Sequence, residues 1–267
     1  MSNSIHSTAQ IDPGAIIGQN VTIGPNCLVE DNVIIGDGVV LDAFAQVKKY
    51  TRLADNVHIH SYAIVGGEPQ HLAYKGEETW VEVGENTVIR EFATIHRGTI
   101  QGNGKTVIGA NCFLMAYVHV AHDCLLSNNV IMSNASSLAG HVEIGHHVMV
   151  SGMSGVHQFV RIGDYAFLGA MGGFGQDVPP YTLATGVRAS LHGLNLIGLR
   201  RNGFSRDAIS ALKKAYQQLF RSETVREQAL VQVEQEFGSV PEVMHFIEFI
   251  KASKRGVTPH KDNGEEA

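Results

Sequence analysis

The sequence contains no run of about 18 apolar residues, so it predicts no membrane-spanning helix. The first ten residues lack the basic and then apolar pattern of a secretory signal peptide, which indicates a cytoplasmic protein. Three cysteines are too few, and odd in number, for a disulfide framework, and they fit reduced thiols. Only 7 prolines accompany 29 glycines, a composition typical of many tight turns rather than of disorder.

Several motifs of catalytic proteins are also missing, since the sequence has no G-x-S-x-G, no P-loop lysine motif and no C-x-x-C. The formal net charge is −6, and no nucleic-acid partner is expected. The charge is uneven, because residues 1–185 carry 8 Lys/Arg and 16 Asp/Glu, whereas residues 186–256 carry 11 and 7. The basic C-terminal segment suits an acidic partner, although an ordinary solvated helical face would give the same balance.

What the sequence does contain is a repeat of six residues. Aliphatic residues recur every six positions from Ile5 to Val65, and resume in the same phase at Val83, Ile89 and Ile95. The repeat then shifts by one residue and continues from Ile108 to Phe174, which gives 26 hexads in all. Neither the 3.6-residue period of a helix nor the two-residue alternation of a half-buried strand explains this pattern.

A triangular prism explains a strict period of six. Each hexad supplies one short strand and one corner, and three hexads make a coil of about 18 residues. Parallel strands then stack about 4.8 Å apart from coil to coil, and the core is buried only by stacking neighbours. The pattern resembles the left-handed parallel β-helix family, so we expect an all-β solenoid of hexapeptide repeats; its handedness follows from the resemblance alone.

The pattern also predicts how the chain is divided. The β-helix is expected over residues 1–185, interrupted by loops at 67–82 and 101–107. Loops that leave a solenoid often cover a site or a partner, although harmless insertions are as common. An α-helical C-terminal domain is expected over residues 186–256, followed by a disordered tail at 257–267.

Three helices are predicted within this C-terminal domain. The first follows Ser205, which has the side chain of an N-cap and precedes an amphipathic pattern. The second is expected over Thr224 to Phe237, and the third over Pro241 to Ala252 with proline in its first turn. Together they would cap the open end of the prism.

Histidines form the most suggestive constellation, since 11 of the 14 lie in residues 1–185. With a coil of about 18 residues, His122 lies beside position 140, one residue from His141. His157 follows on the next coil, so the three form a rough column on one wall, with His119 three residues before His122. Corner histidines exposed to solvent would give some of the same pattern.

Such a column has two chemical interpretations. A neutral imidazole can act as a general base on a hydroxyl, because its pKa near 6.5 suits neutral pH. Several imidazoles can instead bind zinc, and the spacing of His141 and His146 is similar to that of the trimeric γ-class carbonic anhydrases. A cysteine nucleophile is not expected, because Cys27, Cys112 and Cys124 all occupy the interior fifth position of a hexad.

Longer motifs carry a specific resemblance that covers nearly the whole chain. They are Ala93–Thr99, His119–Cys124, Leu138–Val142, Val156–Phe159, Gln176–Tyr181 and Gly203–Arg206. In this order they resemble the UDP-N-acetylglucosamine O-acyltransferase family of lipid A biosynthesis. The hexads alone are shared by many acyl- and acetyltransferases.

The resemblance implies a homotrimer with active sites in the clefts between prisms. It implies transfer of an (R)-3-hydroxyacyl group from acyl carrier protein to the 3-position of UDP-N-acetylglucosamine, the first step of lipid A synthesis. A thioester donor is already activated, so no cofactor and no metal are implied. Residues of the basic segment would meet the acidic carrier protein.

The resemblance also implies roles for particular residues. His122 matches the catalytic base, and Asp123 matches the acid that orients it, which requires a corner conformation because adjacent strand residues point apart. Gly140 matches the position whose backbone N–H stabilises the oxyanion. The matching substrate-contacting positions are His71, His119, His141, His157, Gln158, Asn195 and Arg201, and Ala170 matches the position that sets acyl length.

Some positions depart from the family pattern. Where the family commonly reads Asp-Leu-Lys-Tyr, this chain reads His71-Leu-Ala-Tyr74, and Ile197 and Asn202 replace a common acid and arginine. These changes keep open a 3-amino sugar nucleotide as the acceptor. A γ-type zinc carbonic anhydrase and a non-enzymatic scaffold are the rival classes; the first predicts stoichiometric zinc and the second flat, repetitive faces.

Overall fold

A computed structural model describes residues 2–261 of the chain. Between Ser4 and Phe174, short strands follow one another, and each of the 26 strands from β1 to β26 contains one of the predicted aliphatic residues. These residues are almost all buried; Ile23, Leu41 and Ile59, for example, are at most 1% exposed. The hexads therefore predict both the strands and the side chains that fill the prism.

The described residues form three sheets, one for each wall of the prism. Sheet 1 contains β1 (Ser4–Ile5), β4 (Thr22–Ile23), β7 (Val40–Leu41), β10 (His58–Ile59), β13 (Val88–Ile89), β16 (Phe113–Leu114), β19 (Ile131–Met132), β22 (Met149–Val150), β25 (Phe167–Leu168), β27 (Thr182–Thr185) and β28 (Ser190–Leu194). Sheet 2 contains β2 (Gln10–Ile11), β5 (Leu28–Val29), β8 (Gln46–Val47), β11 (Ile64–Gly67), β14 (Thr94–His96), β17 (His119–Val120), β20 (Ser137–Leu138), β23 (Gly155–Val156) and β26 (Gly173–Phe174). Sheet 3 contains β3 (Ile16–Ile17), β6 (Ile34–Ile35), β9 (Thr51–Leu53), β12 (Trp80–Val83), β15 (Lys105–Ile108), β18 (Leu125–Leu126), β21 (Glu143–Ile144) and β24 (Arg161–Ile162).

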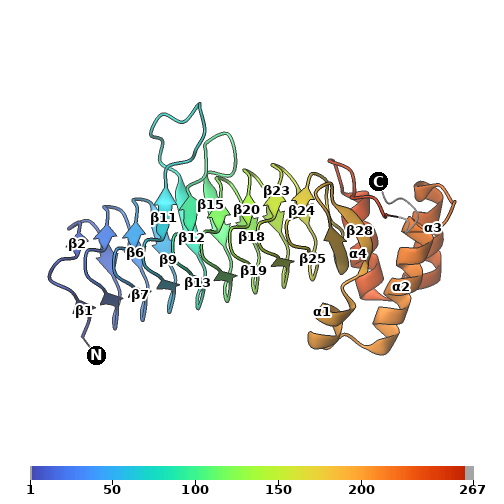
Figure 1. The fold of residues 1–267 in the computed structure, drawn as a ribbon, viewed down its shortest axis with the longest axis horizontal. Coiled ribbons are helices and arrows are strands. Elements are labelled where there is room, and N and C mark those ends of the chain that lie inside the picture. Colours follow the sequence, from blue (N-terminus) through green and yellow to red (C-terminus); the bar gives the residue numbers. More distant parts are fainter. Residues whose placement is uncertain (1, 262–267) are drawn as a thin grey trace.

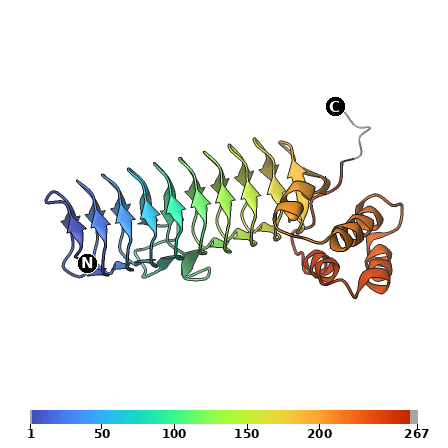
Figure 2. The same ribbon diagram turned by 90° about the horizontal axis from the view of Figure 1, so that it is seen from below.

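The coils stack as a left-handed parallel β-helix, and the three sheets form its walls along the whole length of the stack (Figures 1 and 2). Ser4 lies opposite Thr22, which sets the regular offset at 18 residues. The two interruptions lengthen this offset without breaking the sheets, so that Ile59 pairs with Ile89 and Ile89 with Leu114. The insertions therefore leave the solenoid as loops, and Figure 1 shows them side by side on one edge.

The corners depend on residues with left-handed backbone conformations. Asn56 and Asn86 lie at successive coils of one corner with φ of 57°, a conformation that asparagine adopts more readily than most residues. Phe44 (φ 64°) and Asp123 (φ 61°) adopt the same conformation at the other two corners. The wall positions can therefore stay extended while each corner turns the chain by about a third of a circle.

The three cysteines lie in the interior, as their position in the hexads predicts. Cys27, Cys112 and Cys124 are free, and each is at most 2% exposed. Burial raises the pKa of Cys124 to about 12, so its thiol stays protonated at neutral pH. This environment agrees with a packing role and disfavours a cysteine nucleophile.

Both loops are anchored to the solenoid. The longer one connects β11 to β12, and its base is held by Arg97, whose guanidinium is 1% exposed. Arg97 donates to the backbone oxygen of Gly66 (3.0 Å) and to the hydroxyl of Tyr74 (2.7 Å). The shorter loop connects β14 to β15 and folds over Asp123, as described below.

The C-terminal part differs from its expected boundaries. Residues 186–195, expected in the helical domain, include β28, which pairs with β27 in an antiparallel hairpin and extends sheet 1. The helices are α1 (Leu196–Arg201), α2 (Arg206–Phe220), α3 (Arg226–Phe237) and α4 (Pro241–Lys251). Ser205 caps α2 by accepting from the N–H of Ala208 (3.0 Å), as its side chain predicts. No helix within residues 2–261 is long and apolar enough to cross a membrane.

The last described residues return to the solenoid, which corrects the expectation of a disordered tail from 257 onward. Val257 and Thr258 are 6% and 2% exposed, and the N–H of Thr258 donates to the oxygen of Asp177 (2.9 Å). Lys261 donates to Leu191 in the same way (3.2 Å). The remainder of the expected tail, residues 262–267, lies outside the described residues.

Candidate active site

A groove of ≈ 810 Å³ runs along the outer face of sheet 2. Its floor is made by outward-facing positions of successive coils, which become smaller toward the C-terminal end: His119, Ser137, Gly155 and Gly173. A side chain at Gly155 would meet no atom within 4 Å, so the glycine leaves this part of the groove open. The floor therefore suits a long, thin, largely apolar group.

The β27–β28 hairpin closes the far end of this groove. Val187, Arg188 and Ala189 line it there, and the backbone oxygen of Val187 lies 2.4 Å from where a Cβ on Gly173 would be. Glycine at position 173 thus lets the hairpin approach the sheet. Arg188 gives this end a positive charge.

A histidine–carboxylate pair lies at the other end of the groove. Nδ1 of His122 donates to Oδ2 of Asp123 (2.8 Å), which leaves Nε2 of His122 as the ring nitrogen without this partner. The two residues are adjacent in sequence, and they can face each other because Asp123 is a corner residue with a φ of 61°.

The carboxylate of Asp123 is buried but fully hydrogen-bonded. It accepts from the backbone N–H of Thr99 (3.0 Å), from the hydroxyl of Thr99 (2.7 Å) and from the N–H of Asn103 (2.9 Å). Burial raises the pKa of Asp123, but hydrogen bonds from Thr99 and His122 outweigh it and hold the pKa below its usual value. Asp123 is therefore a fixed anion that orients the imidazole of His122.

The shorter loop supplies these donors because it contains glycine. A Cβ at Gly102 would lie 2.3 Å from Cγ of Asp123, so only glycine lets the backbone wrap the carboxylate this closely. The glycine-rich insertion predicted from the sequence thus encloses the buried side chain of Asp123 and donates hydrogen bonds to it.

Two further histidines surround His122. The rings of His71 and His141 meet it edge-on, with centroids 5.2 and 5.1 Å away, and Nε2 of His141 lies 3.8 Å from Oδ2 of Asp123. Burial lowers the pKa of His141. His71 reaches the site from the longer loop, so that loop contributes to the site although its sequence departs from the family pattern.

Gly140 lies beneath the imidazole of His122. A Cβ at this position would lie 2.6 Å from Cε1 of His122, so any side chain would displace the ring. Within residues 2–261 the N–H of Gly140 donates no hydrogen bond, which leaves it free for a ligand. Gly140 and His122 both line this end of the groove.

The remaining predicted residues separate into two groups. His119 and His157 line the groove; Nδ1 of His119 lies 2.8 Å from the hydroxyl of Thr94, and Nδ1 of His157 accepts from Arg255 (2.8 Å). Burial lowers the pKa of His119. The other four do not line the groove within the single chain: Gln158, Ala170, Asn195 and Arg201.

The structure gives those four other surroundings. Asn195 is the N-cap of α1, accepts from the N–H of Gly198 (3.0 Å) and donates to the oxygen of Tyr165 (2.9 Å). Gln158, Ala170 and Arg201 are exposed.

The sequence reasoning assigned no role in the groove to most of its lining residues, among them the polar Gln70, His96 and Arg188. His96 is the last residue of β14, on the coil before His119, and their rings lie 5.2 Å apart. The coil register would have found it, but the shorter loop lengthens the offset here from 18 to 25 residues, as the pairing of Thr94 with His119 shows. Arg188 lies in a hairpin that has no hexad pattern.

The metal interpretation of the sequence receives little support at this site. His146 lies outside the cluster formed by His122, Asp123 and His141, and its Nδ1 accepts from the N–H of Asn128 (3.3 Å). The oxygens of Asp123 already accept from Thr99, Asn103 and His122. A left-handed β-helix with an oriented imidazole, a free N–H and an apolar groove defines a hexapeptide-repeat acyltransferase.

Comparisons with known proteins identify the family. A family model described as UDP N-acetylglucosamine O-acyltransferase, domain 2, matches residues 177–258, and one described as GMPPB C-terminal domain matches residues 2–67. The chain is 49% identical over 255 residues to the acyl-[acyl-carrier-protein]–UDP-N-acetylglucosamine O-acyltransferase of Thermodesulfovibrio yellowstonii, covering 96% of this chain and 99% of that protein.

Solved structures agree with this relationship. LpxA from Acinetobacter baumannii superposes with a TM-score of 0.92 at 44% identity, covering 95% of this chain and 99% of that chain. The UDP-N-acetylglucosamine acyltransferase from Campylobacter jejuni gives a TM-score of 0.92 at 40% identity, with 97% and 100% coverage. The chain belongs to the UDP-N-acetylglucosamine O-acyltransferase family.

Proposed function

We propose that this chain transfers an (R)-3-hydroxyacyl group from acyl carrier protein to the 3-hydroxyl of UDP-N-acetylglucosamine, the first step of lipid A biosynthesis. The relative from Thermodesulfovibrio yellowstonii is named for O-acylation of UDP-N-acetylglucosamine by acyl-[acyl-carrier-protein]. The observation that carries the proposal is the contact of His122 with the buried Asp123, which leaves Nε2 of His122 beside the groove.

The reaction follows from this geometry. Nε2 of His122 takes the proton of the sugar hydroxyl as its oxygen attacks the thioester carbonyl, while Asp123 stabilises the resulting imidazolium. The N–H of Gly140 donates to the oxyanion of the tetrahedral intermediate. The intermediate collapses by expelling the thiolate, which takes the proton back from His122. An activated thioester needs neither metal nor cofactor for these steps.

The groove supplies the binding sites. The acyl chain lies along the glycine floor at Gly155 and Gly173, where no side chain projects into the groove. His71 and His141 contact the ring of His122, and His119 lines the same groove; we assign all three to the acceptor. His157 and Gln158 follow one coil further along.

A homotrimer would complete this site, because Ala170, Asn195, Arg201 and Gln158 lie outside the groove of their own chain. We assign Asn195 and Arg201 to substrate contacts, and Ala170 to acyl length, in the groove of a neighbouring subunit. A ridge of exposed aromatic rings supports assembly: Phe44, Tyr62, Phe92 and Tyr117 stack with centroids 5.0 to 5.1 Å apart. Exposed apolar surface of this kind usually marks a subunit contact.

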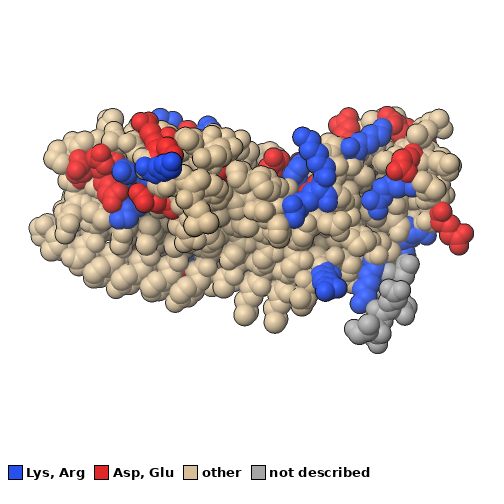
Figure 3. Space-filling model, turned by 90° about the horizontal axis from the view of Figure 1, so that it is seen from above, with Lys and Arg blue, Asp and Glu red and all other residues tan. Residues whose placement is uncertain are grey.

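The acidic carrier protein would dock on the C-terminal part. Figure 3 shows Lys and Arg gathered over that end of the molecule, whereas the solenoid shows a patch of mixed sign. A hollow there is lined by Arg200, Arg206 and Lys213, without an acidic residue. The three buried thiols fit a reducing cytoplasm, where acyl carrier protein would be available.

Reversal of charge in this hollow tests the docking surface. Arg206→Glu combined with Lys213→Glu should raise KM for acyl carrier protein by about tenfold and weaken its dependence on salt. KM for UDP-N-acetylglucosamine should stay unchanged. The matched control is Lys214→Glu with Arg226→Glu, which changes the charge equally on side chains that lie over Phe237 and Phe220 instead. Equal effects of both pairs would refute a specific surface.

The reaction itself is tested by acyl transfer from a panel of (R)-3-hydroxyacyl carrier proteins. The wild-type chain should acylate UDP-N-acetylglucosamine, and His122→Ala should lower kcat by about 10²–10⁴-fold, the usual contribution of a general base. The control is His146→Ala, an exposed histidine outside the groove. Turnover only of the 3-amino sugar nucleotide would replace the acceptor, and turnover of neither would refute acyl transfer.

A further inference from the structure

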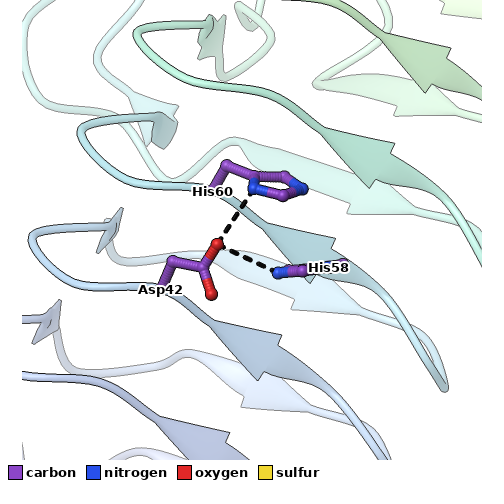
Figure 4. Close-up of side chains that lie close together, drawn as sticks. All are labelled: Asp42, His58 and His60. Carbon is purple, nitrogen blue, oxygen red and sulfur yellow. Dashed lines mark ion pairs between the residues drawn. The ribbon is translucent and has the colours of Figure 1, made fainter.

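A second group of two histidines and one aspartate lies on sheet 1, away from the groove. His58 belongs to β10, and His60 directly follows that strand, two residues after His58, so both side chains leave the same face. Asp42 follows β7 on the preceding coil, and the pairing of Leu41 with Ile59 places it beside His60. Figure 4 shows the three side chains pointing toward one another from these two coils.

The contacts among them are close without being ordinary hydrogen bonds. Oδ2 of Asp42 lies 3.1 Å from Nε2 of His58 and 2.9 Å from Nδ1 of His60. Nε2 of His58 is a buried atom that makes no hydrogen bond within residues 2–261. One carboxylate oxygen thus lies within 3.1 Å of a nitrogen of each ring, and the two rings stack with centroids 4.0 Å apart.

We propose that Asp42, His58 and His60 bind one divalent first-row transition-metal ion, with zinc as the preferred ion. Two imidazole nitrogens and one carboxylate oxygen are a ligand set typical of zinc sites that keep a water in the fourth position. All three ligand atoms lie within 4.8 Å of one another. Bonds of about 2.0–2.1 Å in a tetrahedron require ligand atoms about 3.3 Å apart. This is slightly more than the 3.1 and 2.9 Å that separate Oδ2 of Asp42 from the two ring nitrogens. A small opening of the cluster therefore suffices.

The surroundings support a cation. Burial, and then the neighbouring His58, lowers the pKa of His60. On the next coil, Arg90 is held by two hydrogen bonds of 2.9 Å to Glu91, and Glu91 lies 3.9 Å from Nδ1 of His60. Because Arg90 is paired with Glu91 and not with Asp42, the carboxylate of Asp42 remains available to a divalent ion.

A bound ion would link two successive coils of the solenoid. The coil that carries Asp42 and the coil that carries both histidines are already joined by the β7–β10 and β8–β11 pairings, and the ion would add a further link. Because metal binds the folded arrangement and not the separated coils, it should stabilise the N-terminal half of the solenoid. The side chains are 21% to 36% exposed, so the ion can enter from solvent.

Metal binding to the full chain, measured directly, tests the site. After treatment with a chelator, the wild type should take up one equivalent of Zn²⁺ in a calorimetric titration, and Co²⁺ should give visible absorption bands at the same stoichiometry. Zn²⁺ should also raise Tm. Asp42→Asn and His60→Gln should each abolish the uptake and the shift in Tm, while retaining the wild-type circular dichroism spectrum.

The matched control removes a histidine from the other cluster. His141→Gln should keep the full equivalent of Zn²⁺, because His141 lies beside His122 and not at sheet 1. The absence of saturable uptake by the wild type would overturn the proposal. So would uptake that survives both Asp42→Asn and His60→Gln, or uptake that only His141→Gln removes.

Discussion

Asp42 and Asp123 each lie against two histidines on the same solenoid, yet their surroundings differ. The side chain of Asp123 is 0% exposed, and its oxygens accept from Thr99, Asn103 and His122. The side chain of Asp42 is 36% exposed and accepts no hydrogen bond within residues 2–261. The carboxylate of Asp123 is thus held rigidly against the imidazole of His122, whereas that of Asp42 contacts both His58 and His60.

The difference arises from the interruption of the repeat. Asp123 lies at a corner, and the loop between β14 and β15 folds over it and contributes Thr99 and Asn103. Asp42 lies at the end of a strand in an uninterrupted coil, where no loop is available to supply donors. A regular solenoid can bring histidines and a carboxylate together, but orienting one proton acceptor requires an insertion.

The largest effect should come from replacing each carboxylate in turn. Asp123→Asn should lower kcat by about 10²–10⁴-fold, because an amide places an N–H where Thr99 and His122 both donate, and so misorients the base. Asp42→Asn should leave kcat and KM unchanged. Steady-state acyl transfer measures both.

Equal losses of kcat in Asp123→Asn and Asp42→Asn would contradict separate roles for the two carboxylates, since the two clusters would then act together. A normal circular dichroism spectrum of Asp123→Asn, together with retained affinity for UDP-N-acetylglucosamine, would separate misorientation from misfolding.

A smaller effect is expected from the glycine beneath His122. Gly140→Ala keeps the backbone N–H but places a Cβ 2.6 Å from the imidazole, which must move. We expect kcat to fall by about 10²-fold, the scale of a base displaced by roughly an ångström. Measurement of kcat beside Tm tests this, because a purely structural role for Gly140 would lower Tm with little change in kcat.

The sequence predicts the solenoid better than the site. Six-residue periodicity predicts all 26 strands of the prism, since burial on one side and a turn at each corner are both local in sequence. Asp123 could be expected at a corner, but the donors that hold it come from a loop whose conformation depends on Gly102 and on packing. His58 and His60 are two residues apart in the sequence, but Asp42 is brought beside them only by the pairing of β7 with β10 on successive coils.

The smallest predicted effect concerns stability and pH. Hydrogen bonds hold the pKa of Asp123 below its usual value of 3.8, so the carboxylate stabilises the folded state above that pH. This contribution is lost as pH falls through the lowered pKa of the folded state. Asp123→Asn should therefore reduce the free energy of unfolding by about 1–3 kcal/mol at neutral pH. In urea titrations, the difference in the free energy of unfolding between Asp123→Asn and the wild type should become smaller below about pH 4.

Asp42→Asn, on an exposed side chain, should change the free energy of unfolding by less than about 1 kcal/mol. A difference for Asp123→Asn that stays constant down to low pH would show that shape, and not charge, makes this carboxylate important.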